Sequence, residues 1–366
     1  MFSFTTAKYS DPLNLRIAIS VVIYCLAVSA VPIYNKRLLD GEDIEKFEYP
    51  VALAGLQLGA VAILCTMINI IQHFETDASG KSSWLLGSHF VYKFRHVAPV
   101  GVLFGVKYAI TNWGLDLVDT GTHLLLQSTD LLWTVGFARI LNSEYLDILS
   151  SAAVLLSSLG SILIGAQACD DLKTPFVPLL VNLLTPVFLA LCITTLRKGT
   201  KELMRKDNIC GGVSAFEFTA MKLFLSSMTA LLLACLMENG AWGLGADKIS
   251  WWRAFEQYET AGKIIILGGA VFVLIFQVNI TWLSALTSAT TVGIVGGMKV
   301  VPQWGINSIF AVDNKKTFSW YVILGASCVM ASSVFYAWSK FIKIEKEKKE
   351  NEDKLNLRKG LLENRV

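Results

Sequence analysis

The chain has 366 residues, of which 54% are hydrophobic and only 17% are charged, and its mean hydropathy is +0.52. A soluble domain carries about 25% charged residues, so this composition disfavours a soluble enzyme. The apolar content also excludes a disordered chain. The net charge of +3, without a basic stripe interleaved with aromatics, argues against a nucleic-acid partner. We therefore expect a membrane protein that is embedded in a lipid bilayer.

Ten apolar stretches are long enough to cross a bilayer, whose hydrocarbon core of about 30 Å needs roughly 20 helical residues. No small-residue cleavage site follows the first stretch, so we do not expect a cleavable signal peptide. The sequence predicts an all-α membrane protein with an N-terminal segment, 1–14, and a charged tail, 340–366. In chain order the stretches lie near residues 15–34, 51–71, 97–117, 121–141, 146–167, 175–196, 213–236, 262–284, 289–311 and 318–339.

The Lys and Arg residues outside these stretches predict the orientation of the chain. If both termini are cytosolic, most of these residues fall on the cytosolic side, and the tail contributes the largest share. Cytoplasmic loops carry an excess of Lys and Arg, so we expect cytosolic termini. On this assignment Lys93 belongs to a cytosolic loop, and the acidic segment 40–48 lies on the opposite side.

Ten stretches divide into two sets of five, 15–167 and 175–339, and an odd number per half inverts one half relative to the other. Such inverted repeats are typical of secondary transporters. In support, Asp130 and Lys299 are charges in corresponding stretches, and an acidic residue follows each of them fourteen positions later. We therefore expect Asp130 and Lys299 to lie in contact or on opposite sides of a central cavity.

Three lysines, Lys107, Lys222 and Lys299, lie well inside apolar stretches. A lysine near the bilayer centre costs about 2.5–3.5 kcal/mol, so each needs an aqueous cavity or an acidic partner. Lys299 follows Gly296 and Gly297 and could reach a substrate phosphate, or it could form an ion pair with an acid such as Asp130. Lys222 is equally compatible with a functional and a structural role, and Lys107 could bind substrate or extend its ammonium group to the membrane surface.

The fourth stretch carries three polar residues, His123, Gln127 and Asp130, at spacings of four and three that place them on one helical face. This pattern predicts the wall of a cavity. Asp130 could orient a lysine, accept a hydrogen bond from a sugar hydroxyl or bind a proton. Tyr108 and Asn279 could contact a base or could serve only in packing.

No cofactor or metal is expected. The seven cysteines show no CxxC spacing, and no Cys or Asp stands at ligand spacing from His123. Motifs typical of membrane-embedded hydrolases, HExxH and GxSxG, do not occur in the sequence, so we do not expect an enzyme.

Five segments of the sequence together carry a family resemblance. They are Tyr34-Asn35-Lys36, the segment 111–115, the segment 141–146 with Glu144, the segment 286–299 that ends in Gly296-Gly297-Met298-Lys299, and the segment 335–338. These segments resemble those of the triose-phosphate translocators and nucleotide-sugar transporters of the drug/metabolite transporter superfamily. The resemblance covers nearly the whole chain and implies ten helices in two inverted repeats, antiport, and a small phosphorylated substrate.

The sequence also departs from these families. Plastid triose-phosphate translocators have Lys-Arg where Lys299 is followed by Val300, so a phosphate clamp would need Lys222 or Lys107. GDP-mannose transporters have Phe-Tyr-Asn-Asn where Phe218 precedes Thr219 here, so guanine recognition is not carried over.

The functional expectation follows from this comparison. We expect an antiporter of a nucleotide sugar and a nucleoside monophosphate in the Golgi or endoplasmic reticulum, with both termini cytosolic. The alternative is an exchanger of smaller organophosphates and phosphate. A homodimer is compatible with either expectation.

Overall fold

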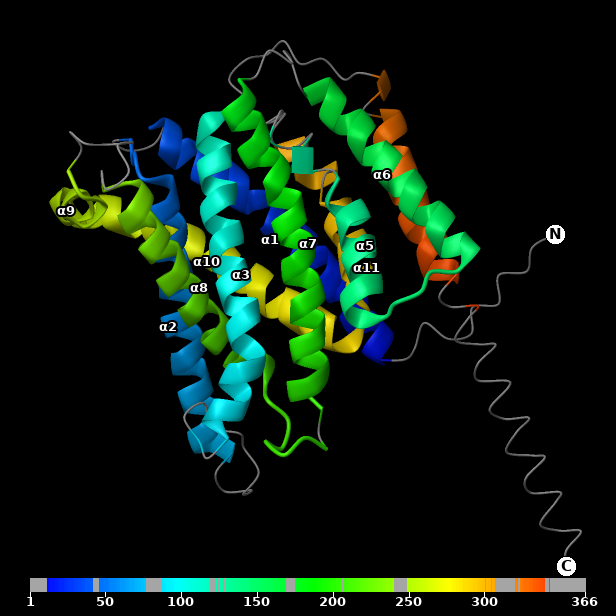
Figure 1. Ribbon diagram of the computed structural model, residues 1–366, viewed down its shortest axis with the longest axis horizontal. Coiled ribbons are helices and arrows are strands. Elements are labelled where there is room, and N and C mark those ends of the chain that lie inside the picture. The colour runs from blue at the N-terminus through cyan, green and yellow to red at the C-terminus, as the bar shows by residue number, and fades with distance from the viewer. Residues whose placement is uncertain are drawn as a thin grey trace, which may run out of the picture.

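The computed structural model describes residues 12–41, 46–76, 89–118, 129–168, 175–205, 207–239, 249–299, 301–303 and 323–339, with positions 87, 123, 126, 127, 305, 306, 320, 321 and 342 between and beyond them. All regular structure in these ranges is helical, and they contain no strand (Figure 1). The labelled helices are α1 (Pro12–Asp40), α2 (Pro50–Thr76), α3 (Phe90–Leu117), α5 (Asp130–Asn142), α6 (Ile148–Ala168), α7 (Phe176–Leu203), α8 (Ala215–Met237), α9 (Trp251–Gln257), α10 (Thr260–Leu286) and α11 (Ala289–Met298). A further helical segment covers 323–339.

Within the described residues, five helices are long and apolar enough to cross a membrane, namely those in α1, α2, α7, α8 and α10. Ile148–Leu163 and Ile323–Ser339 are shorter apolar helices. The predicted all-helical class is therefore confirmed, whereas the count of ten spans and the inverted repeat stay predictions. The N-terminal residues 1–11 and all of the tail except Ile342 lie outside the described residues.

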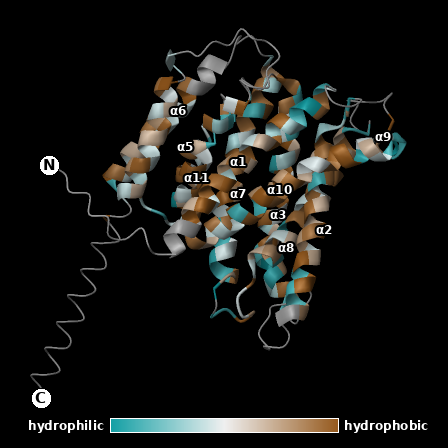
Figure 2. Ribbon diagram, turned by 180° about the vertical axis from the view of Figure 1, so that it is seen from behind, coloured by the Kyte–Doolittle hydropathy of each residue, from teal (hydrophilic) through white to brown (hydrophobic). Residues whose placement is uncertain are grey.

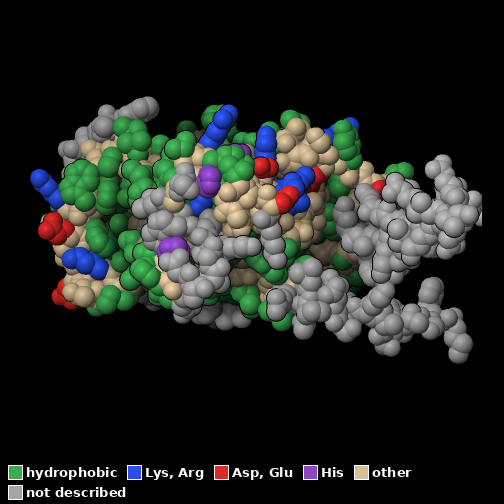
Figure 3. Space-filling model, turned by 90° about the horizontal axis from the view of Figure 1, so that it is seen from below, with side chains coloured by type: hydrophobic (Ala, Val, Ile, Leu, Met, Phe, Trp, Pro, Cys, Tyr) green, Lys and Arg blue, Asp and Glu red, His purple; other side chains and the backbone are tan. Residues whose placement is uncertain are grey.

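The outside of the bundle is apolar. Hydrophobic residues predominate along the helices in Figure 2, and large aliphatic and aromatic side chains such as Ile63, Leu159 and Val334 are exposed. An apolar surface of this extent is compatible with contact to hydrocarbon. Seen from below, the end of the bundle carries Lys, Arg, Asp, Glu and His side chains among hydrophobic ones (Figure 3).

The helices pack in neighbouring pairs. α2 lies along α8, α3 lies against both α7 and α8, α1 lies against α10, and α5 lies against α7 and α11. Close approach of α3 and α8 depends on glycine at position 105. A Cβ atom there would lie 2.6 Å from the carbonyl oxygen of Ser226, which is too close for any side chain.

Two carboxylates bind helix N-termini at opposite ends of the bundle. Glu144, directly after α5, accepts hydrogen bonds from the backbone N–H groups of Ala289 and Thr290 at the start of α11, at 2.9 and 3.1 Å. Glu238, directly after α8, accepts from those of Val51 and Ala52 at the start of α2. Figure 1 places the start of α2 at the upper end and the start of α11 at the lower end. Each contact satisfies N–H groups that have no partner within their own helix.

The connection from α7 to α8 is held by side chains outside the apolar segments. Arg205 forms an exposed ion pair with Asp207, and its hydrogen bond to that residue lowers the pKa of the Asp207 carboxyl. Ser214 accepts a hydrogen bond from the Glu217 N–H and so caps α8.

The structure corrects the expected position of Lys93. The sequence placed it in a loop, but α3 begins at Phe90, and the Lys93 side chain is buried with its Nζ 2.5 Å from Glu217 of α8. The hydropathy pattern misplaced the start of this helix, because the charged residues of a buried ion pair lower the mean hydropathy of a sequence window as much as loop residues do.

Candidate functional site

A narrow cavity lined by both polar and apolar side chains lies inside the bundle, between α1, α3, α7, α10 and the residues that follow α11. About 40 Å³ of it admits water-sized molecules, which is room for only a few waters. Its lining combines two lysines, three amide side chains, one threonine and two tyrosines with apolar side chains: Tyr24, Val28, Val31, Pro32, Lys107, Tyr108, Thr111, Asn112, Leu115, Gln127, Leu189, Phe276, Lys299 and Gln303.

Lys107 is a cavity-lining cation without a carboxylate partner among the described residues. It is 8% exposed, and its Nζ lies 4.2 Å from the centre of the Tyr108 ring. Within the part of the chain that the structure describes, no carboxylate lies within ion-pair distance of this ammonium group. A contact with an aromatic face stabilises a lysine by only about 0.5–2 kcal/mol, so Lys107 can still accept an anion from the cavity.

Lys299 and Asp130 form a buried ion pair. The Lys299 ammonium donates to Asp130 Oδ2 at 2.8 Å, and the two side chains are 6% and 5% exposed. Lys299 stands at the C-terminal end of α11, and Asp130 is the first residue of α5. The expected contact between these residues is confirmed, and Lys299 is the member of the pair that lines the cavity.

His123 and Gln127 belong to a chain of hydrogen bonds that ends at the cavity. The Asn182 amide nitrogen donates to the carbonyl oxygen of Gly114, so its oxygen is the atom that accepts from His123 Nδ1, at 2.6 Å. The other ring nitrogen, Nε2, then accepts from the Gln127 amide at 2.8 Å. His123 is therefore assigned as a neutral imidazole, which fixes the orientation of Gln127.

Four polar residues in or next to the cavity lining were not predicted from the sequence as site residues, namely Gln277, Asn112, Asn35 and Gln57. Tyr108 binds Gln277 through its hydroxyl group, and the Asn112 side-chain oxygen accepts from Asn35 at 3.3 Å. Gln57 donates to Asn35 in turn, at 2.9 Å. Asn35 and Asn112 stand in two of the segments that carry the family resemblance, and that position was the one available signal for them.

Other candidates lie outside the cavity lining. Asn279 accepts a hydrogen bond from Ser20 and so joins α10 to α1. Gly296 is close to Tyr24 of the cavity, since a Cβ there would be 3.5 Å from the Tyr24 hydroxyl, whereas Gly297 faces Ser157 of α6. The structure thus brings together Lys107, Tyr108, Gln127 and Lys299 in the lining, with His123 and Asp130 in contact with it.

Lys222 occupies a separate buried position. Its ammonium group donates to the Thr281 hydroxyl at 2.9 Å and lies 4.7 Å from the centre of the Phe104 ring. No carboxylate in the described ranges pairs with it, and it does not line the cavity. Of Lys107 and Lys222, only Lys107 shares the cavity lining with Lys299.

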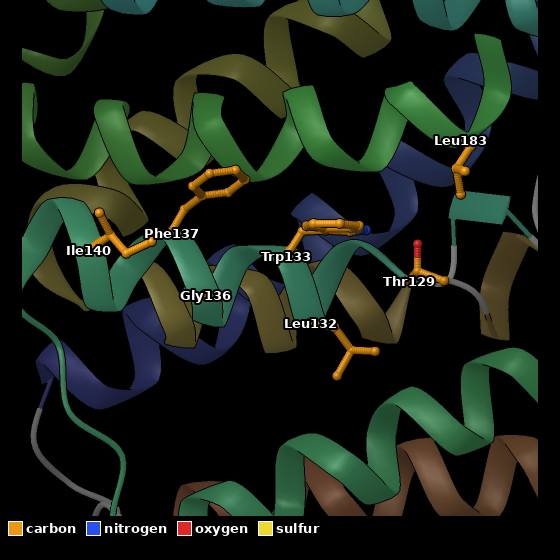
Figure 4. Close-up of a pocket in the computed structure, with 7 residues that line it drawn as sticks. All are labelled: Thr129, Leu132, Trp133, Gly136, Phe137, Ile140 and Leu183. Carbon is orange, nitrogen blue, oxygen red and sulfur yellow. The ribbon is translucent and has the colours of Figure 1, made fainter. Parts of the chain in front are cut away.

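A larger groove lies on the side of α5 (Figure 4). It has a volume of about 520 Å³, and Trp133 and Phe137 point from α5 toward α7 along it. The other lining residues are Thr129, Leu132, Gly136, Ile140 and Leu183, so the groove contains no charged group. An apolar lining of this kind fits hydrocarbon rather than a phosphorylated molecule.

The described residues contain no group of three or more His, Cys, Asp or Glu side chains that could hold a metal ion. Nor does any family model or curated protein match the sequence. Among solved structures, one described only as "Crystal structure of protein" is similar over 88% of this chain and 96% of its own, with a TM-score of 0.58 and 13% identity. At this identity the similarity shows the fold alone.

Proposed function

We propose that the chain is a secondary transporter that exchanges a nucleotide sugar for a nucleoside monophosphate across the Golgi or endoplasmic reticulum membrane. In this proposal the bundle has ten spans in two inverted repeats, 15–167 and 175–339, with both termini cytosolic. The observation that carries it is Lys107, a buried cation that lines the cavity with Lys299 and has no carboxylate partner in the part of the chain that the structure describes.

The chemistry of the cavity fits a phosphorylated ligand. An ammonium group on a flexible stem binds phosphate as a point charge. Among the described residues, no carboxylate pairs with the Lys107 ammonium group and would compete with a substrate phosphate for it. The rings of Tyr24 and Phe276, 5.4 Å apart, offer an aromatic surface for a base. The amides of Asn112 and Gln303 can bind hydroxyl groups or base edges.

The narrowness of the cavity supports transport by alternating access. Ligand sites for molecules of nucleotide size occupy roughly 300–1,000 Å³, far more than the space present here. In this proposal the structure corresponds to a closed state, and a substrate enters after helices move apart at one end. Such motion around a central site is the mechanism of inverted-repeat transporters.

Exchange by purified protein in liposomes tests the proposal. Vesicles preloaded with nucleoside monophosphate should take up nucleotide sugar faster than empty vesicles, and Lys107→Gln should lower the exchange rate at least about tenfold, a loss of about 1.4 kcal/mol. Lys198→Gln removes an exposed lysine of α7 and should exchange at the normal rate. Equal rates for Lys107→Gln and Lys198→Gln would remove Lys107 from the site.

The alternative substrate is a smaller organophosphate. It is favoured by the presence of two lysines, Lys107 and Lys299, in one narrow cavity. Competition decides between the two: if a triose phosphate and inorganic phosphate inhibit uptake at lower concentrations than nucleoside monophosphates do, the substrate is the smaller class.

A further inference from the structure

In the ligand-free protein, two lysines and one carboxylate in or next to the cavity lining leave a small net positive charge. Lys107 and Lys299 line the cavity, and Asp130 neutralises Lys299. Within the described residues these groups leave one net positive charge. Without the carboxylate, two unneutralised ammonium groups would share a space that holds only a few waters. A like-charge pair in a poorly hydrated site is strongly unfavourable.

Asp130 is also placed to control how the cavity closes. It is the first residue of α5 and contacts Lys299 at the end of α11, while Glu144, directly after α5, binds the N–H groups at the start of α11. The two helices are therefore joined at both ends. Of these two contacts, only that of Lys299 with Asp130 involves a residue that lines the cavity, so only that one is open to competition by a bound anion.

We propose that Asp130 is a built-in counter-ion that allows the empty transporter to close, and that it thereby sets the ratio of exchange to uniport. This inference rests on the proposed transport function. A transporter must close without substrate to return empty, and the internal carboxylate takes the place of the substrate anion on Lys299 during that step. The protein should therefore combine exchange with a measurable uniport component.

The same charges predict that Asp130, which favours closure of the empty transporter, disfavours closure with a bound phosphate. A phosphate monoester brings up to two negative charges. With Asp130 present, the loaded cavity would carry a net charge of about −1, whereas without it the two lysines and the phosphate would balance. Removing the carboxylate should therefore slow the return of the empty transporter and favour closure with substrate.

The first test is Asp130→Asn in proteoliposomes. Uptake into vesicles preloaded with nucleoside monophosphate is divided by uptake into empty vesicles, and this ratio should rise roughly tenfold, the factor that corresponds to about 1.4 kcal/mol of barrier. Asp207→Asn is the matched control, since it also removes the carboxylate of an ion pair, but an exposed one. Its ratio should equal that of the unmodified protein. An unchanged or lower ratio for Asp130→Asn would overturn the inference.

A second measurement does not depend on transport. Hydrogen exchange of the α5 and α11 backbone amides reports opening of the ligand-free protein. Asp130→Asn should exchange at least about fivefold faster, and Asp130→Asn combined with Lys299→Gln should return toward the normal rate, because the double variant restores one net positive charge. If the double variant exchanges as fast as the single one or faster, the contact rather than the charge matters, and the inference is wrong.

Failure of the inference and failure of the proposed function have different signatures. If the unmodified protein exchanges no phosphorylated compound, while the single and double variants behave as expected in hydrogen exchange, the counter-ion role stands and the substrate class is wrong. If exchange is normal but Asp130→Asn changes neither the uptake ratio nor the hydrogen exchange, the function stands and the counter-ion role is excluded.

Discussion

At the scale of single residues, the pair of Asp130 and Lys299 makes a prediction about stability. Asp130→Ala leaves the Lys299 ammonium buried and unpaired, which should lower the free energy of unfolding by about 3–5 kcal/mol. Asp207→Ala breaks an exposed ion pair and should leave the free energy of unfolding nearly unchanged. Denaturant unfolding in detergent measures both.

A double-mutant cycle separates the pair from its surroundings. The charge-swapped variant, Asp130→Lys with Lys299→Asp, should lose less unfolding free energy than the two single variants lose together. Strict additivity would show that the two side chains do not depend on each other, against the 2.8 Å contact between them.

Residue-level reasoning found this pair because a lysine inside an apolar stretch demands a partner, and Asp130 was the acid at the corresponding position. It could not decide among the lysines. Each of the three lysines was left with a functional and a structural alternative. Of the three, only Lys299 has a carboxylate partner among the described residues, and only Lys107 lines the cavity without one. The pairing of Lys93 with Glu217 was also missed, because contacts between α3 and α8 are set by packing and not by separation along the chain.

At the scale of helices, the close approach of α3 and α8 at Gly105 can be tested by comparing two Gly→Ala substitutions in different surroundings. Gly105→Ala would place a Cβ 2.6 Å from the Ser226 carbonyl oxygen and should cost about 1–3 kcal/mol through forced separation of α3 and α8. Gly136→Ala places its Cβ in open space and should be neutral or slightly stabilising. Thermal unfolding of the two variants compares them; equal effects would argue against the packing of α3 on α8.

The contact of Glu144 with the start of α11 gives a second prediction at this scale. Glu144→Gln keeps an oxygen acceptor but loses the negative charge, so the free energy of unfolding should fall by about 1 kcal/mol. The Ala289 and Thr290 amides should exchange hydrogen faster. Glu256→Gln, at an exposed position of α9, is the control and should leave both measurements unchanged. Unaltered exchange at Ala289 and Thr290 in Glu144→Gln would exclude the capping role.

Hydropathy predicted the helices well in their middles and poorly at their ends. The predicted stretch 51–71 corresponds to α2 and 213–236 to α8, but α3 begins seven residues before the predicted 97. In the predicted stretch 121–141, α5 begins at Asp130, and the described positions 123, 126 and 127 before it are helical as well. α9, with seven residues, was not predicted, because a helix of that length is too short for a hydropathy window designed for membrane spans.

At the scale of the whole molecule, two carboxylate contacts join helices at opposite ends of the bundle that encloses the narrow cavity. Glu238 joins the end of α8 to the start of α2 at one end of the bundle, and Glu144 joins the α5 end to the start of α11 at the other. Both contacts cross between the two proposed halves, 15–167 and 175–339. Each would have to yield in turn if the central cavity opens first to one side and then to the other.

A ligand that binds this cavity should stabilise the whole fold, and the last prediction uses that effect. A compound that binds only the folded state, present at 100 times its dissociation constant, raises the free energy of unfolding by about 2.7 kcal/mol. Nucleoside monophosphates and diphosphates should therefore raise the unfolding temperature in a concentration-dependent way, and the unphosphorylated nucleosides should not. Lys107→Gln should abolish most of the rise because it removes the unneutralised cation of the cavity, while Lys198→Gln should retain it. A rise of equal size in both variants would place the phosphate elsewhere on the protein.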